Sequence, residues 1–169
     1  MDVIRIAGII KESIVDGPGI RMVVFAQGCR HNCPGCHNPQ THSFDGGTLV
    51  TVEHILEQAK KNPLLDGITF SGGEPFEQAE VFAVLARKAR EFNLDIMTYT
   101  GYTYEQLTDG SDRQKGWRAL LDETDILVDG RFELEKKNLL LKFRGSENQR
   151  IIDLKKTRES GRVVLASWM

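Results

Sequence analysis

The three cysteines of the chain, Cys29, Cys33 and Cys36, lie within eight residues and are spaced C-x3-C-x2-C. A thiolate is a soft ligand, and three neighbouring thiolates suit a soft metal centre. The number three is informative, because a structural zinc site is closed by four ligands. A cubane iron–sulfur cluster held by three thiolates leaves one iron open, and an open iron binds and activates a small molecule. The spacing therefore favours an iron–sulfur centre in this loop.

Three other uses of these cysteines remain open on spacing alone. In the first alternative, the three thiolates and either His31 or His37 form a four-ligand zinc site. Residues 33–37 also read C-x-x-C-H, the pattern of c-type haem attachment, although that use leaves Cys29 unexplained. A disulfide plus one free thiol is the third alternative, and an odd cysteine count is a poor disulfide framework.

A second motif, Gly72-Gly73-Glu74-Pro75, directly follows a predicted strand at residues 67–71. Glycines at the carboxyl end of a strand free backbone N–H and C=O groups and admit a ligand close to the main chain. By itself the motif is also an ordinary strand-to-helix turn, in which Glu74 lies near the helix start and interacts favourably with the helix dipole.

Together the two motifs resemble the radical S-adenosylmethionine (SAM) superfamily. The resemblance implies that the three cysteines hold a 4Fe-4S cluster whose unique iron is chelated by the methionine part of SAM. It also implies that residues 72–74 bind the methionine amino group, with Glu74 as the acceptor. In that superfamily one electron from the cluster cleaves SAM to methionine and a 5′-deoxyadenosyl radical, which abstracts a hydrogen atom.

Two further stretches resemble a subgroup of this superfamily, the glycyl-radical-enzyme activating enzymes. Residues 15–21, V-D-G-P-G-I-R, resemble the opening of these enzymes, and residues 144–153, R-G-S-E-N-Q-R-I-I-D, resemble the activating proteins of anaerobic ribonucleoside-triphosphate reductase. The implied partners are the large glycyl-radical subunit of that reductase and a low-potential electron donor such as flavodoxin. Asp16 is assigned to the partner-facing rim. Without the resemblance, both stretches are turns.

Four other residues are assigned to cofactor binding. Gly35 bends the chain tightly between the last two cysteines, and His37 is placed near adenine, although an exposed loop histidine is an equal alternative. Asp129 and Arg131 follow a predicted strand and are expected to reach the SAM ribose or the methionine carboxylate, with a turn acid and a surface arginine as the alternative. His31 is interpreted as a loop residue, and no catalytic side chain is assigned.

The composition of the chain limits the number of domains and the kinds of partner that we expect. The chain has 169 residues, which predicts one radical SAM domain over residues 1–169. A hydrophobic content of 40 %, a charged content of 27 % and a net charge of −2 indicate a globular protein with neither a nucleic-acid nor a membrane partner. The N-terminus lacks signal-peptide features, and unpaired cysteines favour the reducing cytoplasm.

Hydrophobic patterning predicts alternating strands and helices, hence an α/β fold. A full eight-fold β/α barrel needs about 250 residues, so we expect a truncated open β/α barrel, a partial TIM barrel, in which several strand ends converge on one site. Trp168 is expected to dock on the core. The expected strands are residues 3–10, 21–27, 67–71, 94–100 and 125–128, with extended segments at 138–143 and 162–166, and the expected helices begin after Thr51, cover 76–92 and include a stripe at 117–121.

Three other functions stay open at this stage. Within enzymes, the chain activates another glycyl radical enzyme or acts on a small molecule. In a different class, it is a zinc or iron–sulfur binding module without catalysis. The 144–153 stretch favours the reductase, and the Gly-Gly-Glu motif argues against a purely structural metal site.

Overall fold

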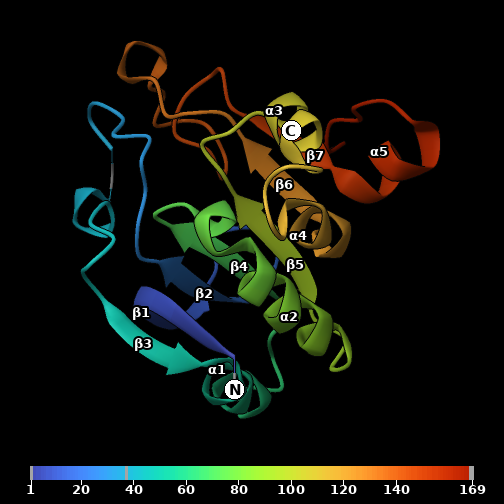
Figure 1. Cartoon of the computed structure of the whole chain (residues 1–169). Coiled ribbons are helices and arrows are strands. Elements are labelled where there is room, and N and C mark those ends of the chain that lie inside the picture. The colour runs from blue at the N-terminus through green and yellow to red at the C-terminus, as the bar shows by residue number, and fades with distance from the viewer. Residues whose placement is uncertain (1, 37, 168–169) are drawn as a thin grey trace.

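The computed structural model describes residues 2–36 and 38–167, so the predictions for His37 and Trp168 lie outside the described residues. The described chain forms a seven-stranded sheet with five α-helices (Figure 1). The strands are β1 (Val3–Ser13), β2 (Arg21–Ala26), β3 (Thr48–Thr51), β4 (Gly67–Gly72), β5 (Asp95–Tyr99), β6 (Ile126–Asp129) and β7 (Arg150–Asp153), the helices are α1 (Val52–Lys60), α2 (Ala79–Arg90), α3 (Tyr104–Gly110), α4 (Trp117–Glu123) and α5 (Leu154–Ser160), and short 3₁₀ turns cover Pro39–Thr41, Pro75–Gln78 and Leu134–Lys136.

The sheet is mixed and open, with β3 and β7 as its outermost strands. Its order is β3-β1-β2-β4-β5-β6-β7, in which the four central strands β2, β4, β5 and β6 run parallel. Strands β1, β3 and β7 pair antiparallel at the two sides. The α/β class expected from the sequence is therefore confirmed. Because the central strands are parallel neighbours, their carboxyl ends meet at one edge, which is where α/β folds place their ligand sites.

One face of the sheet is covered by helices. Side chains such as Ile68 and Phe70 of β4 pack against α1, α2 and α4 in the larger hydrophobic core. The ring of Phe70 lies 4.8 Å from that of Phe82 on α2, centroid to centroid. Helix α1 begins as predicted, because the Thr51 side chain accepts a hydrogen bond from the backbone N–H of His54 and caps the helix.

The opposite, inner face carries a smaller cluster that includes Met97 and Val128. It also carries Arg21, the last residue of the V-D-G-P-G-I-R stretch, whose side chain is fully buried. The Arg21 guanidinium donates to Thr69 Oγ1 at 2.7 Å and to the Pro18 carbonyl at 3.1 Å, and Thr69 Oγ1 donates to the Asp16 carbonyl at 2.8 Å. These bonds fasten the loop between β1 and β2 to the inner face of the sheet.

Several expected elements differ from the structure. Strand β1 extends to Ser13, and the helix expected over 76–92 begins as a 3₁₀ turn. Residues 138–143 form turns, so the expected extended segment is wrong. Of residues 162–166, Leu165 makes only an isolated bridge with Ile152, so a full strand was also wrongly expected. Strand β3 and helices α3 and α5 were not anticipated, because short elements carry little periodicity.

No helix in the described ranges has the length and apolar character needed to cross a membrane.

Phe70→Ala is expected to lower the free energy of unfolding by about 3–5 kcal/mol, because the lost ring leaves a cavity between β4 and α2. Phe92→Ala is the matched control. Phe92 is 43 % exposed, with Lys60 Nζ 4.5 Å from its ring centroid, so its loss should cost less than about 1 kcal/mol. Urea unfolding of both variants measures the difference, and equal losses would contradict this account of the core.

Candidate active site

The carboxyl ends of the four parallel strands border one cavity of about 500 Å³. The three cysteines and four glycines from successive strand ends line it, together with Phe25 and Tyr99 of the sheet and Val15 and Asp16 of the loop between β1 and β2. The residues that the strand ends contribute are Cys29, Cys33 and Cys36 after β2, Gly72 and Gly73 at β4, Thr100 and Gly101 after β5, and Gly130 after β6.

The cysteine loop is held from its two ends. Gly28 has φ of +111° and turns the chain out of β2, and its N–H donates to the Thr41 carbonyl at 2.6 Å. Between the last two cysteines, Gly35 has φ of +73°, and a Cβ there would approach Leu134 to 2.8 Å. Gly35 therefore provides the tight bend predicted for it. It packs against the segment after β6 and is not among the residues that line the cavity.

The three thiols are free, which excludes the disulfide alternative. Burial raises the pKa of Cys29 to about 11, and the nearby Glu74 adds to this rise. Burial and the neighbouring Cys36 also raise the pKa of Cys33. A positively charged centre is what stabilises such thiols as thiolates.

An iron–sulfur cluster fits this donor set, because three soft ligands line one cavity. Among the residues that the structure describes, no three His, Cys, Asp or Glu side chains are gathered around a point that would hold one metal ion. In a cubane each thiolate binds a different iron, so the three sulfurs stand apart from one another.

Gly72 and Gly73 are required by the close approach of β4 to β2. Gly72 has φ of +115°, and a Cβ on it would lie 2.4 Å from the backbone N and O atoms of Ala26. A Cβ on Gly73 would lie 2.4 Å from the Ala26 carbonyl and 2.8 Å from that of Gly28. With no side chains in the way, their backbone groups form part of the cavity wall.

Glu74 occupies a different position from the one that the sequence analysis assumed. It is fully buried and is not among the residues that line the cavity. Its carboxylate accepts hydrogen bonds from the backbone N–H of Phe76 at 3.0 Å, from that of Gly101 at 2.7 Å, and from Thr100 Oγ1 at 2.9 and 3.0 Å. In this structure the carboxylate is therefore engaged by groups of the wall, and its predicted contact with the methionine amino group of SAM stays a prediction.

His31 is a site residue that sequence reasoning missed. It is 8 % exposed, lines the cavity, and places Nε2 2.7 Å from Glu74 Oε1. Its ring packs edge-on against Tyr102, with centroids 4.5 Å apart, and a Cβ on Gly101 would lie 2.5 Å from the ring. The sequence carried one usable signal, a glycine directly after β5, which admits a ring at close range.

Asp129 and Arg131 are not among the residues that line the cysteine cavity, and their predicted contacts with SAM stay predictions. Both border a separate cavity of about 400 Å³. The Asp129 carboxylate pairs with Arg150 and accepts from the Tyr104 backbone N–H at 2.7 Å. Alternation along β6 explains the difference. Val128 faces the inner cluster, so the next side chain points to the other face, and Gly130 is the residue that reaches the cavity.

Asp16 is among the residues that line the cavity, and its predicted role at the partner-facing rim stays a prediction. Its carboxylate accepts a hydrogen bond from Ser13 Oγ at 2.6 Å. This bond and the link of its carbonyl to Thr69 hold Asp16 in a fixed position.

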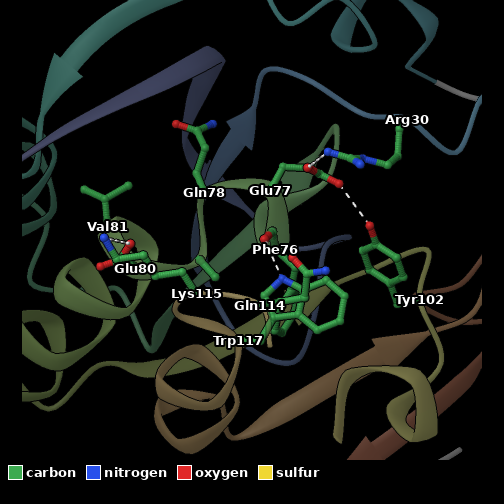
Figure 2. Close-up of a pocket in the computed structure, with 11 residues that line it drawn as sticks. Arg30, Phe76, Glu77, Gln78, Glu80, Val81, Tyr102, Gln114, Lys115 and Trp117 are labelled. Carbon is green, nitrogen blue, oxygen red and sulfur yellow. Dashed lines mark hydrogen bonds and ion pairs between the residues drawn. The ribbon is translucent and has the colours of Figure 1, made fainter. Parts of the chain in front are cut away.

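A second cavity, of about 470 Å³, is lined by Arg30 of the cysteine loop, by Glu77 and by Trp117, among others (Figure 2). Here Arg30 reaches over to Glu77 with a separation of 2.7 Å, and the Tyr102 hydroxyl donates to the same carboxylate at 2.9 Å. Burial and Glu77 raise the pKa of Tyr102, so its hydroxyl keeps the donating proton. Trp117 also lines this cavity, and its indole N–H donates to the Phe76 carbonyl at 3.0 Å. The contacts tie the cysteine loop to the start of α2.

Comparison with known proteins places this geometry in a family. A family model described as a 4Fe-4S single cluster domain matches residues 15–152. Curated relatives named anaerobic ribonucleoside-triphosphate reductase-activating protein are 37 % identical over 146 residues in Haemophilus influenzae and 38 % over 144 residues in Vibrio cholerae, each match covering 80 % of this chain and 89 % of the relative. The same-named protein of Enterobacteria phage T4 is 35 % identical over 145 residues, which cover 81 % of this chain and 86 % of the relative.

Among solved structures, QueE from Escherichia coli aligns with a TM-score of 0.47 and 14 % identity, over 60 % of this chain and 54 % of that chain, which is too distant to support a functional argument. The family model and the curated relatives agree over most of the chain. The chain therefore belongs to the family of anaerobic ribonucleoside-triphosphate reductase-activating proteins, which confirms the predicted family of activating enzymes and, through the family model, the predicted 4Fe-4S cluster.

Proposed function

We propose that this protein cleaves SAM reductively at a 4Fe-4S cluster and generates the glycyl radical of anaerobic ribonucleoside-triphosphate reductase by removing hydrogen from a glycine of its large subunit. The observation that carries the proposal is the single cavity that joins the three cysteines to the inner face of the sheet. A cluster at the cysteine end and a peptide entering from the other end would meet within it.

The strand ends supply the wall on which SAM would lie. When bound, the cluster supplies the electron for cleavage, and SAM supplies the group that takes hydrogen from glycine. Gly72 and Gly73 present backbone groups to the cavity, and their carbonyl oxygens are suited to an ammonium. Glu74 keeps Gly101 and Phe76 in place through its hydrogen bonds. The side chain thus acts on the wall that the ligand would contact.

The inner face of the sheet is suited to shielding a reactive species from water. Phe25, Tyr99 and Phe143 line the cavity below the cysteines, and Tyr99 is fixed by donation to the Phe143 carbonyl at 2.5 Å. Excluding water protects a radical from side reactions. The chain's share of the chemistry is therefore to position and enclose the reactants.

The type of barrel, the extent of the domain, the cellular location and the electron donor are also part of the proposal. The strand order, which begins at β3 and ends at β7 without closing, supports the view that the sheet is an open partial barrel, forming one domain over residues 1–169. Free thiols support a reducing cytoplasmic location. The electron is proposed to come from a low-potential donor such as flavodoxin.

The test is anaerobic reconstitution with iron and sulfide, reduction, and addition of SAM. We expect an EPR signal of the reduced cluster that SAM perturbs, formation of 5′-deoxyadenosine, and a glycyl radical on added reductase. A colourless protein that binds zinc and ignores SAM would overturn the proposal. SAM cleavage without a radical on the reductase would redirect it to another glycyl radical enzyme or to a small molecule.

Alanine at position 29, 33 or 36 is expected to abolish SAM cleavage, because the cubane loses one of its three protein ligands. Iron and sulfide content and 5′-deoxyadenosine formation measure the effect, with the wild-type protein reconstituted in parallel. Cleavage at the wild-type rate in any one variant would contradict the cluster assignment.

Glu74→Ala is expected to weaken SAM binding and to lower the free energy of unfolding by about 3 kcal/mol, because buried N–H donors lose their acceptor. Glu74→Gln should lose less, since its amide keeps the shape but turns one acceptor into a donor. Glu53→Gln, at the exposed ion pair with Lys88, is the control and should change stability by less than about 1 kcal/mol. SAM titration and urea unfolding test all three, and a Glu74→Ala protein with unaltered SAM affinity and stability would refute the positioning role.

A further inference from the structure

Four exposed apolar side chains lie in the two loops that contribute Val15 and Leu141 to the lining of the cysteine cavity. We propose that these residues, Ile14, Val15, Leu139 and Leu140, form a docking surface for the glycine-bearing segment of the large reductase subunit. The inference rests on the proposed function, since it names the part of this chain that would receive the protein substrate.

The exposure of these side chains is unusually high for their type. Ile14 and Val15 are each 72 % exposed, Leu139 is 82 % exposed and Leu140 is 94 % exposed. Single exposed apolar residues are common, but a group around one opening marks an interaction site. The two pairs come from loops more than 120 residues apart in the sequence and flank the same cavity.

Both loops continue directly into the cavity wall. Val15 and Asp16 line it from one side, and Leu141 and Phe143 line it from the other. In Figure 1 the orange loop after β6 stands beside the cysteine loop, over the carboxyl ends of the strands. A peptide that reaches the cysteines from this mouth therefore passes along the exposed apolar side chains. This continuity identifies the occupant as the segment that must enter the cavity.

The loop at residues 133–147, which carries Leu139 and Leu140, is held by hydrogen bonds although its tip is exposed. Gln149 Oε1 accepts from the backbone N–H groups of Gly145 and Ser146 at 2.8 and 3.1 Å, and Gln149 Nε2 donates to the Gly130 carbonyl at 3.0 Å. At the tip, Asn138 Oδ1 accepts from the Leu140 N–H at 2.9 Å. A loop ordered in this way presents its leucines without paying the ordering cost on binding.

The charge of the loop favours a peptide over a lipid surface. Residues 133–147 contain four basic and three acidic side chains, which nearly cancel. Binding to anionic lipid requires an excess of Lys and Arg near the surface. Apolar contact, and not charge, therefore determines which partner this loop binds. We expect the partner segment to carry apolar side chains next to its glycine.

The experiment compares two double variants of the cluster-loaded protein. Leu139→Ser with Leu140→Ser is expected to weaken binding to the purified large subunit about tenfold or more, because two buried leucines are lost from the interface, and to lower the glycyl radical yield at limiting activating protein. Leu49→Ser with Leu64→Ser is the matched control. Those leucines are 58 % and 64 % exposed and do not line the cavity, so binding, radical yield and SAM cleavage should stay at the wild-type level.

Iron content and thermal midpoint confirm that each variant is folded and loaded. Equal affinity of wild type and the 139/140 variant for the large subunit would overturn the docking surface, as would equal weakening in both double variants. Loss of binding to phosphatidylglycerol vesicles with unchanged reductase binding would also overturn it and assign the leucines to a membrane. A wild-type protein that binds the reductase but does not cleave SAM would instead overturn the proposed function.

Discussion

The buried carboxylate of Glu74 is the interaction on which the geometry of the site depends. It joins the cysteine loop through His31, the end of β4 through Phe76 and the end of β5 through Thr100 and Gly101. A carboxylate removed from water is costly unless each lone pair finds a donor, so all these groups must be in place together. The three strand ends are thereby fixed relative to one another before any cofactor binds.

The division of labour between the two faces of the sheet follows from side-chain alternation. On one face, Phe70 and its neighbours pack against helices and supply most of the core. On the other, Arg21 and Thr69 bind the V-D-G-P-G-I-R loop, and Tyr99 leads up to the cysteines. Stability is thus concentrated on the helical face, which leaves the inner face open enough to form a cavity.

The motifs at the two ends of the chain have similar physical roles. Arg21 secures the loop that carries Asp16, and Gln149 secures the loop that carries Leu141. In both cases a polar side chain binds backbone groups and so replaces the regular pairing that a strand would provide. The motif residues therefore shape the mouth of the cavity from behind, and the residues they present form its walls.

The sequence by itself determined the cysteine motif, the Gly-Gly-Glu turn, the α/β class and the family, because these depend on local spacing and on periodicity along the chain. It placed the four central strands close to their observed positions, since their apolar runs are continuous. Only the tertiary structure decided where Glu74, His31, Asp129 and Arg131 lie. Their roles depend on which face of a strand end a side chain takes and on which neighbours meet it there. Leu139 and Leu140 show the same limit of sequence-based prediction. An apolar run predicts a buried strand, but in the folded chain these two residues lie in an exposed turn.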